Sequence, residues 1–218
     1  MRDLVKANQL QFDLIMIGHQ RANVYFGDDP RSPPRGKPVT CTSSLIRGLD
    51  WSGEPFCLLI DPTLREKPED FYFELYRRTG LRPSEITACF STHEHFDHLE
   101  GLSYFPNAKW FVGKTNLPWA SSSMIIDKYK LIGVEGELYP GVFVVPLPGH
   151  TNTLHGISFM LDDKSYIVAG DAVVTRYHFK DFTNNYEDDA EAARQTQLRI
   201  KQEYDVVVPG HDNLIIIK

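Results

Sequence analysis

One short segment holds the densest group of side chains that could do chemistry. Four potential metal ligands fall within six residues, namely His93, His95, Asp97 and His98. Imidazole nitrogens and a carboxylate suit a borderline divalent ion such as zinc, and the segment has no thiolate to complete a closed structural site. In an extended chain His93 and His95 point the same way and can bind one ion, whereas a turn into a helix can direct Asp97 and His98 to a second. The segment therefore predicts a centre of two divalent ions.

Three more candidate ligands follow apolar runs that are typical of strands. His150 and His211 each end a Pro-Gly-His sequence, and Asp171 follows the run 167–170. A carboxylate at the end of a strand can bridge two cations, because each of its oxygens can contact one of them. These three residues strengthen the prediction of a metal centre.

Apolar runs and helical patterns alternate along the chain. Two segments predict helices, 68–79 and 188–204, because acidic residues open them and apolar residues recur at helical spacing. Helices among many strands favour two sheets with helices outside, in one domain over 1–218. The proline-rich run 28–38 predicts an exposed loop. Nine short apolar runs predict strands, at 12–17, 44–46, 56–60, 86–90, 110–112, 142–145, 157–161, 166–169 and 206–208.

Composition restricts the partners of the chain. Lys and Arg total 23 against 29 Asp and Glu, which gives a formal charge of -6 and argues against a broad nucleic-acid-binding surface. Residues 1–11 contain no continuous apolar run, so we expect no signal peptide or membrane span and a cytoplasmic location. The three cysteines lack a CxxC spacing, and Cys57 and Cys89 lie in apolar runs, which predicts buried free thiols. Aromatic loop residues leave room for a homodimer interface.

In their order along the chain, these motifs resemble the metallo-β-lactamase superfamily over roughly residues 12–214. The resemblance implies a four-layer αββα sandwich with the site at one edge between the sheets. Asp61, which ends an early strand, would either fix a histidine ring from behind or form a turn before Pro62. The resemblance also implies a ligand set, with His93, His95 and His150 on one metal, Asp97, His98 and His211 on the other, and Asp171 bridging them.

At several positions this chain differs from known branches of the superfamily, which reduces the number of branches that it resembles. Flavodiiron oxidoreductases of this fold have Glu where this chain has His95, and the commonest β-lactamases have Cys where Asp171 stands. Glyoxalase II proteins continue into a helical domain, whereas this chain ends seven residues after His211. Acyl-homoserine lactonases place a tyrosine shortly after the bridging Asp, where this chain has Val173 and Val174 and reaches Tyr177 late. Some small single-domain members are linked to RNA processing, which the acidic balance disfavours.

The expected activity is hydrolysis of an ester, thioester or lactone by a hydroxide that bridges two divalent ions. Zinc is the first choice of metal, with iron or manganese as alternatives. Asp97 would bind one metal and also act as a catalytic residue that orients the hydroxide or receives its proton. Small molecules are the expected substrates. The alternatives are a phosphodiesterase or nuclease acting on RNA or DNA, and a weakly active metal-binding regulatory module.

Substrate selection should come from loops around the metals. The first candidate is the segment 176–182, in which Tyr177 and His178 could contact substrate; the alternative is an exposed loop with Phe179 and Phe182 packed on the fold. The second candidate is 114–124, which contains Trp119 and three serines. Neither His19 nor His155 falls on the matched pattern, so both are expected to be structural.

Overall fold

A computed structural model describes residues 10–18, 40–63, 67–124, 126–181 and 187–218. His19, Phe182 and the predicted loop 28–38 lie outside these residues. In the described part of the chain, no helix has both the length and the apolar character needed to cross a membrane.

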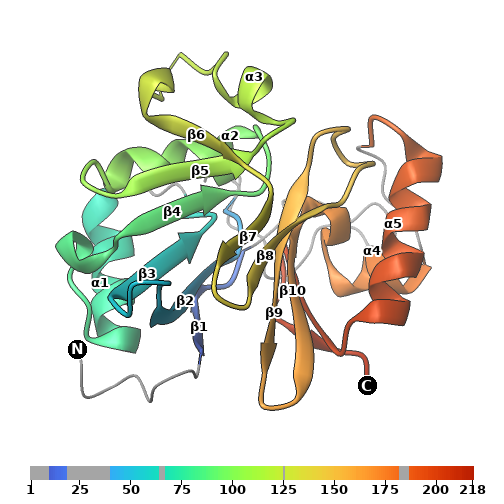
Figure 1. Ribbon diagram of the computed structural model, residues 1–218. Helices are drawn as coiled ribbons and strands as arrows, with labels where there is room; N and C mark the ends of the chain where they lie inside the picture. Colours follow the sequence, from blue (N-terminus) through green and yellow to red (C-terminus); the bar gives the residue numbers. More distant parts are fainter. Residues whose placement is uncertain (1–9, 19–39, 64–66, 125, 182–186) are drawn as a thin grey trace.

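The amino-terminal half forms a six-stranded sheet in which strand order follows chain order. Its first three strands pair antiparallel, and the next pairings, from the third strand to the sixth, are parallel. Figure 1 shows helices on the outer side of this sheet. The strands are β1 (Gln11–Met16), β2 (Ser43–Leu49), β3 (Pro55–Ile60), β4 (Ala88–Ser91), β5 (Lys109–Gly113) and β6 (Leu131–Val134), and the helices are α1 (Pro68–Thr79), α2 (Phe96–Leu99) and α3 (Leu117–Ala120).

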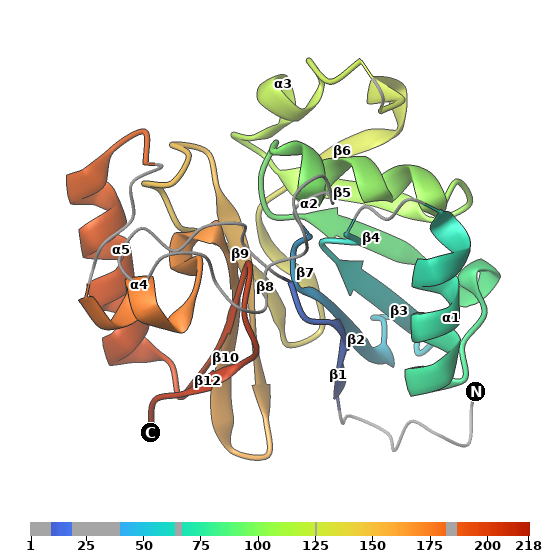
Figure 2. The same ribbon diagram turned by 180° about the vertical axis from the view of Figure 1, so that it is seen from behind.

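The carboxyl-terminal half forms the second six-stranded sheet, which is antiparallel except where β10 pairs with β11. Two helices cover its outer face, so that the layers run helix, sheet, sheet, helix (Figures 1 and 2). This is the predicted αββα sandwich. The strands are β7 (Gly136–Tyr139), β8 (Val142–Pro146), β9 (His155–Leu161), β10 (Lys164–Gly170), β11 (Val206–Pro209) and β12 (Ile215–Ile216), and the helices are α4 (Arg176–Asp181) and α5 (Ala190–Glu203).

Both faces of the first sheet are buried, so its central strands are apolar throughout. Successive side chains of a strand point to opposite faces. Leu45 and Cys89 therefore join the core beneath the outer helices, whereas their neighbours Ile46 and Phe90 join the core between the two sheets. A third core lies under α5, where Ile200 packs with residues of β10 and β11. Alternation thus assigns neighbouring residues to different layers.

Most of the predicted elements are present. Both predicted helices and all nine predicted strands occur, with shifts of a few residues at their ends, and the cysteines are buried free thiols as predicted. The sequence reasoning missed β6, β7, β12 and α3. The prediction of a loop over 176–182 was wrong, because Arg176–Asp181 forms α4. Phe179 explains the helix, since its ring is buried in the third core and lies under the Lys201 ammonium.

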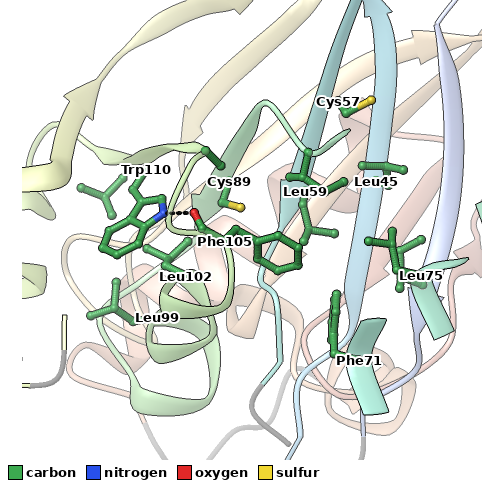
Figure 3. Packing of buried hydrophobic residues seen from close by; sticks show 14 of the residues in the cluster. Leu45, Cys57, Leu59, Phe71, Leu75, Cys89, Leu99, Leu102, Phe105 and Trp110 are labelled. Carbon is green, nitrogen blue, oxygen red and sulfur yellow. Dashed lines mark hydrogen bonds between the residues drawn. The ribbon is translucent and has the colours of Figure 1, made fainter. Parts of the chain in front are cut away.

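The buried indole of Trp110 offers a test of this packing. Its Nε1 donates a hydrogen bond of 2.9 Å to the Phe105 carbonyl in the first core (Figure 3). Trp110→Phe removes this donor and part of a buried ring, while the Phe105 carbonyl keeps its hydrogen bond of 3.1 Å from the Ala108 N–H, so we expect the free energy of unfolding to fall by about 1–3 kcal/mol. Trp51→Phe is the control, because Trp51 is 65% exposed, and it should change stability by less than about 0.5 kcal/mol. Urea denaturation measures both, and equal losses would contradict the assignment.

Candidate metal centre

All seven predicted ligands come from segments that follow the carboxyl ends of four strands. His93, His95, Asp97 and His98 follow β4, and His150 follows β8; Asp171 and His211 follow β10 and β11. β8 and β10 both run antiparallel to β9, and β11 runs parallel to β10, so their carboxyl ends meet at one edge of the second sheet. The fold therefore brings together residues that are up to 118 positions apart, from His93 to His211.

The first donor cluster contains His93, His95, His150 and Asp171. His95 Nδ1 lies 2.9 Å from His93 Nε2 and 3.1 Å from His150 Nε2. Asp171 Oδ2 lies 3.4 Å from His150 Nε2. Only His95 has an exposed side chain in this cluster, so it forms the solvent side of the centre.

The second donor cluster contains Asp97, His98 and His211, all buried. Asp97 Oδ2 is 3.8 Å from His98 Nε2 and 3.5 Å from His211 Nε2. The other oxygen of Asp171, Oδ1, is 3.2 Å from His98 Nε2 and 3.3 Å from His211 Nε2. Asp171 thus directs one oxygen to each cluster, which is the arrangement a bridging carboxylate needs.

Hydrogen bonds behind the clusters fix two of the rings. Asp61 Oδ2 lies 2.9 Å from His98 Nδ1, and the same carboxylate accepts bonds from the backbone N–H and the hydroxyl of Thr92, each at 2.8 Å. His211 Nδ1 lies 3.0 Å from the Thr40 carbonyl oxygen. An Nδ1–H donated to these oxygens leaves the Nε2 lone pairs of His98 and His211 free to bind a cation. Of the two interpretations of Asp61, the contact with a histidine ring is the one that the geometry supports.

The buried charges of the centre require positive partners. Burial lowers the pKa of His93, and it lowers the pKa of His150 to about 4, so both rings are neutral at pH 7 and can act as ligands. Burial also acts to raise the pKa of Asp171, but the imidazoles of His211, His98 and His150 hold the pKa of this carboxyl well below its usual range. A buried carboxylate is stable only beside compensating charge.

The donor atoms fit divalent cations. Among the described residues, the buried atoms His98 Nε2 and Asp171 Oδ1 have no hydrogen-bond partner, although they lie 3.2 Å apart. In the first cluster, three imidazole nitrogens face one another at short range. Neutral imidazole nitrogens and carboxylate oxygens, with no thiolate, form a donor set that zinc, iron or manganese accepts. Cations placed among these atoms would satisfy groups that the protein leaves unpaired.

Comparison with known proteins identifies the fold family. The family model described as the metallo-beta-lactamase superfamily matches residues 36–211. This chain belongs to the metallo-β-lactamase superfamily.

Several relatives within the superfamily are lactonases. An N-acyl homoserine lactonase of Bacillus thuringiensis is 27% identical over 157 residues, which cover 66% of this chain and 63% of the relative. A structure of a variant of AiiA from B. thuringiensis, with N-decanoyl-L-homoserine bound at the active site, aligns with a TM-score of 0.66 and 21% identity over 95% of this chain and 94% of that one. AidC, described as a dizinc quorum-quenching lactonase, aligns with a TM-score of 0.65 and 16% identity over 81% and 75%. The match thus spans 63% of the length of the curated B. thuringiensis relative.

The two predicted substrate residues of this superfamily member lie on α4 in different surroundings. The Tyr177 side chain is 40% exposed, whereas His178 is buried and its Nδ1 lies 2.8 Å from the Thr175 hydroxyl. Arg176, at the start of the same helix, makes a two-bond ion pair with the buried Asp212, next to His211 in the chain. The described part of this segment is therefore anchored beside His211.

Several residues that position the centre were not singled out from the sequence. Thr92 bonds Asp61, Arg176 pairs with Asp212, and the buried Cys41 thiol lies 2.9 Å from the Asp97 carbonyl oxygen. Each of these contacts joins segments that are distant in the chain, so no local pattern indicates them. The contact of Asp61 with His98 spans 37 residues. The resemblance to the superfamily was its only signal.

Gly210 offers a test of how closely these loops must approach. A Cβ added at Gly210 would lie 1.8 Å from Asp171 Oδ1. Gly210→Ala must therefore displace either the Asp171 carboxylate or the His211 loop, and we expect the free energy of unfolding to fall by about 1–3 kcal/mol. Chemical denaturation measures this loss. Stability equal to that of the wild type would show that the two loops are not packed as described.

Proposed function

We propose that this protein is a hydrolase of esters, thioesters or lactones that uses two divalent ions, zinc being the first choice of metal. The observation that carries the proposal is the carboxylate of Asp171, whose oxygens face the two donor clusters at 3.2–3.4 Å. The description of AidC as dizinc supports the choice of metal. The single domain, the cytoplasmic location and the homodimer stay predictions.

The ligand assignment follows the two clusters. His93, His95 and His150 would hold one ion, Asp97, His98 and His211 the other, and Asp171 would contact both. When bound, two such ions lower the pKa of water towards about 7 and polarise a carbonyl oxygen. The low pKa values of His93 and His150 favour this use, because a ligand ring must be unprotonated, whereas the pKa values of His98 and His211 are raised, so binding of the second ion would release protons from these rings.

Asp97 is the residue to which we assign proton transfer. Its Oδ2 lies 3.5 Å from His211 Nε2 within the second donor cluster, beside the position proposed for one ion. In the proposed reaction, the oxygen of water forms a bond to the substrate carbonyl carbon, and Asp97 orients that water and receives its proton. The bond from carbon to the leaving oxygen or sulfur then breaks, and the proton passes from Asp97 to the leaving group. The products are a carboxylic acid and an alcohol or thiol.

The surroundings of the centre favour a carbonyl substrate without negative charge over a phosphodiester. Glu94 lies within the metal-binding segment and Glu100 follows it, and both would repel an anionic backbone. The lactonase relatives point to the same class. Val174 is buried in the region where the acyl-homoserine lactonases place a tyrosine, so the exposed Tyr177 is the aromatic hydroxyl of α4 that we assign to the substrate wall.

Metal content tests the bridging role of Asp171. Protein purified without chelators should contain two ions per chain by elemental analysis. Asp171→Asn removes a negative charge shared by both ions, so we expect at most one ion and a loss of hydrolysis beyond the roughly 10–100-fold typical of outer-shell changes. Glu135→Gln also removes one carboxylate, but from an exposed residue paired with Lys114, and should leave both values unchanged. Full metal content in Asp171→Asn would refute the bridge.

A substrate panel tests the reaction class. Wild-type protein and Asp171→Asn should be assayed with acyl-homoserine lactones, simple lactones, thioesters, aryl esters and a phosphodiester. We expect the wild type to hydrolyse at least one of the carbonyl classes faster than the phosphodiester, because no charge repels those substrates. Cleavage of the phosphodiester alone would favour the nuclease alternative. Two bound ions without turnover on any substrate would favour the regulatory module.

A further inference from the structure

A hollow of about 380 Å³ lies beside the first donor cluster. Its lining includes Glu94 and Phe96, the two chain neighbours of His95, which is the exposed member of that cluster. Trp119 in α3 and Met124 just after it also line the hollow. Figures 1 and 2 show α2 and α3 on the same outer side of the first sheet. A group held in the hollow would therefore lie against the segment that carries His95.

The apolar side chains of this hollow are unusually exposed. Phe96 is 52% exposed, Trp119 60% and Met124 fully, whereas Leu99 and Ala120 on the same two helices are buried in the first core. The helices thus already have the apolar contacts that hold them on the sheet. Large apolar side chains gathered at the surface beside a cleft mark a ligand site.

The hollow is also negatively charged. Glu94 and Glu100 both line it, and none of its described lining residues is basic. The Glu94 carboxylate is held in place by the Asn116 side-chain amide, and the Thr151 hydroxyl lies 3.4 Å from it. Within the described ranges, neither glutamate forms an ion pair with Lys or Arg. The lining of the hollow therefore combines two acidic residues with two aromatic ones.

The apolar and the acidic side chains of the hollow together favour one chemical class of ligand. An anionic group would be repelled by both glutamates, and a hydrocarbon chain would remove the Glu100 carboxylate from water without giving it a partner, which costs free energy. A cationic group satisfies both features, because carboxylates attract its charge and the faces of Phe96 and Trp119 attract it through their ring quadrupoles. An alkylated ammonium also offers methyl groups to the apolar walls.

We propose that the hollow formed by Glu94, Phe96, Glu100, Trp119 and Met124 binds an ammonium group of the substrate, so that the preferred substrates are cationic esters or lactones. This inference rests on the proposed hydrolase function and names its substrate class. Glu100 and Trp119 are specificity-determining residues in it, because neither belongs to the donor clusters.

Two isosteric substrates test the charge. One is an aryl ester whose acyl chain ends in a trimethylammonium group, and the other is the same ester with an uncharged tert-butyl group in its place. We expect kcat/KM to favour the cationic ester by about tenfold at low ionic strength, and this preference to shrink as salt is added. Equal values for the two esters would overturn the proposal.

Two variants locate the preference. Glu100→Gln and Trp119→Ala should each reduce the ratio of kcat/KM for the cationic ester over the tert-butyl ester towards one. Glu135→Gln removes an exposed carboxylate outside the hollow and should leave the ratio unchanged. A preference that persists in both variants would place the cation elsewhere and overturn the assignment.

A binding measurement separates this proposal from the hydrolase proposal. Tetramethylammonium chloride, compared with sodium chloride at equal ionic strength, should shift the Trp119 indole resonance in the NMR spectrum of the metal-loaded protein. Glu100→Gln should abolish that shift. A shift without hydrolysis of any ester would leave the cation site standing and refute the hydrolase. Hydrolysis of both esters at equal rates without a shift would refute the cation site alone.

Discussion

The buried carboxylate of Asp171 is the constraint on which the rest of the centre depends. An ionised group without solvent is costly unless close hydrogen-bond donors or positive charges offset that cost. Imidazoles from three separate segments, those of His98, His150 and His211, come within 3.4 Å of its oxygens. The loops that carry them must therefore meet within a few ångströms at one edge of the sandwich. A side chain at position 210 would already prevent that approach.

Backbone hydrogen bonds hold the loops around Asp171 in a fixed geometry. Gly210 and His211 donate their N–H groups to the carbonyls of Val173 and Val174, each at 2.9 Å, which joins the turn after Asp171 to the loop of His211. The ion pair of Arg176 with buried Asp212 adds α4 to the same unit. Because these bonds do not involve the donor atoms, the ligands are held in position before any cation arrives. Because the loops are already ordered, the free energy of substrate binding is not used to order them.

The sequence predicted the donors better than their supports, for a physical reason. The donors are recognisable in the sequence because four of them lie close together in the segment 93–98, and because His150 and His211 each follow the end of a strand. The contacts that hold the donors in place, such as the hydrogen bond from Thr92 to Asp61, join residues 31 positions apart and leave no local pattern. The strands β6 and β7 escaped prediction because each has four residues and a glycine. Helix α4 escaped because a six-residue helix depends on tertiary packing, here of Phe179, more than on its own pattern.

The charges around the centre differ in sign from place to place, so they can orient a substrate. Two divalent ions among Asp97 and Asp171 would leave a net positive point that attracts a carbonyl oxygen, whereas Glu94 and Glu100 make the neighbouring hollow negative. Glu94 lies between His93 and His95 in the chain, and charges closer than the Debye length, about 10 Å at 0.1 M salt, are not fully screened. A substrate with a carbonyl at one end and a cation at the other is therefore oriented before it makes contact. The overall charge of -6 acts in the same sense, since it concentrates cations and repels polyanions.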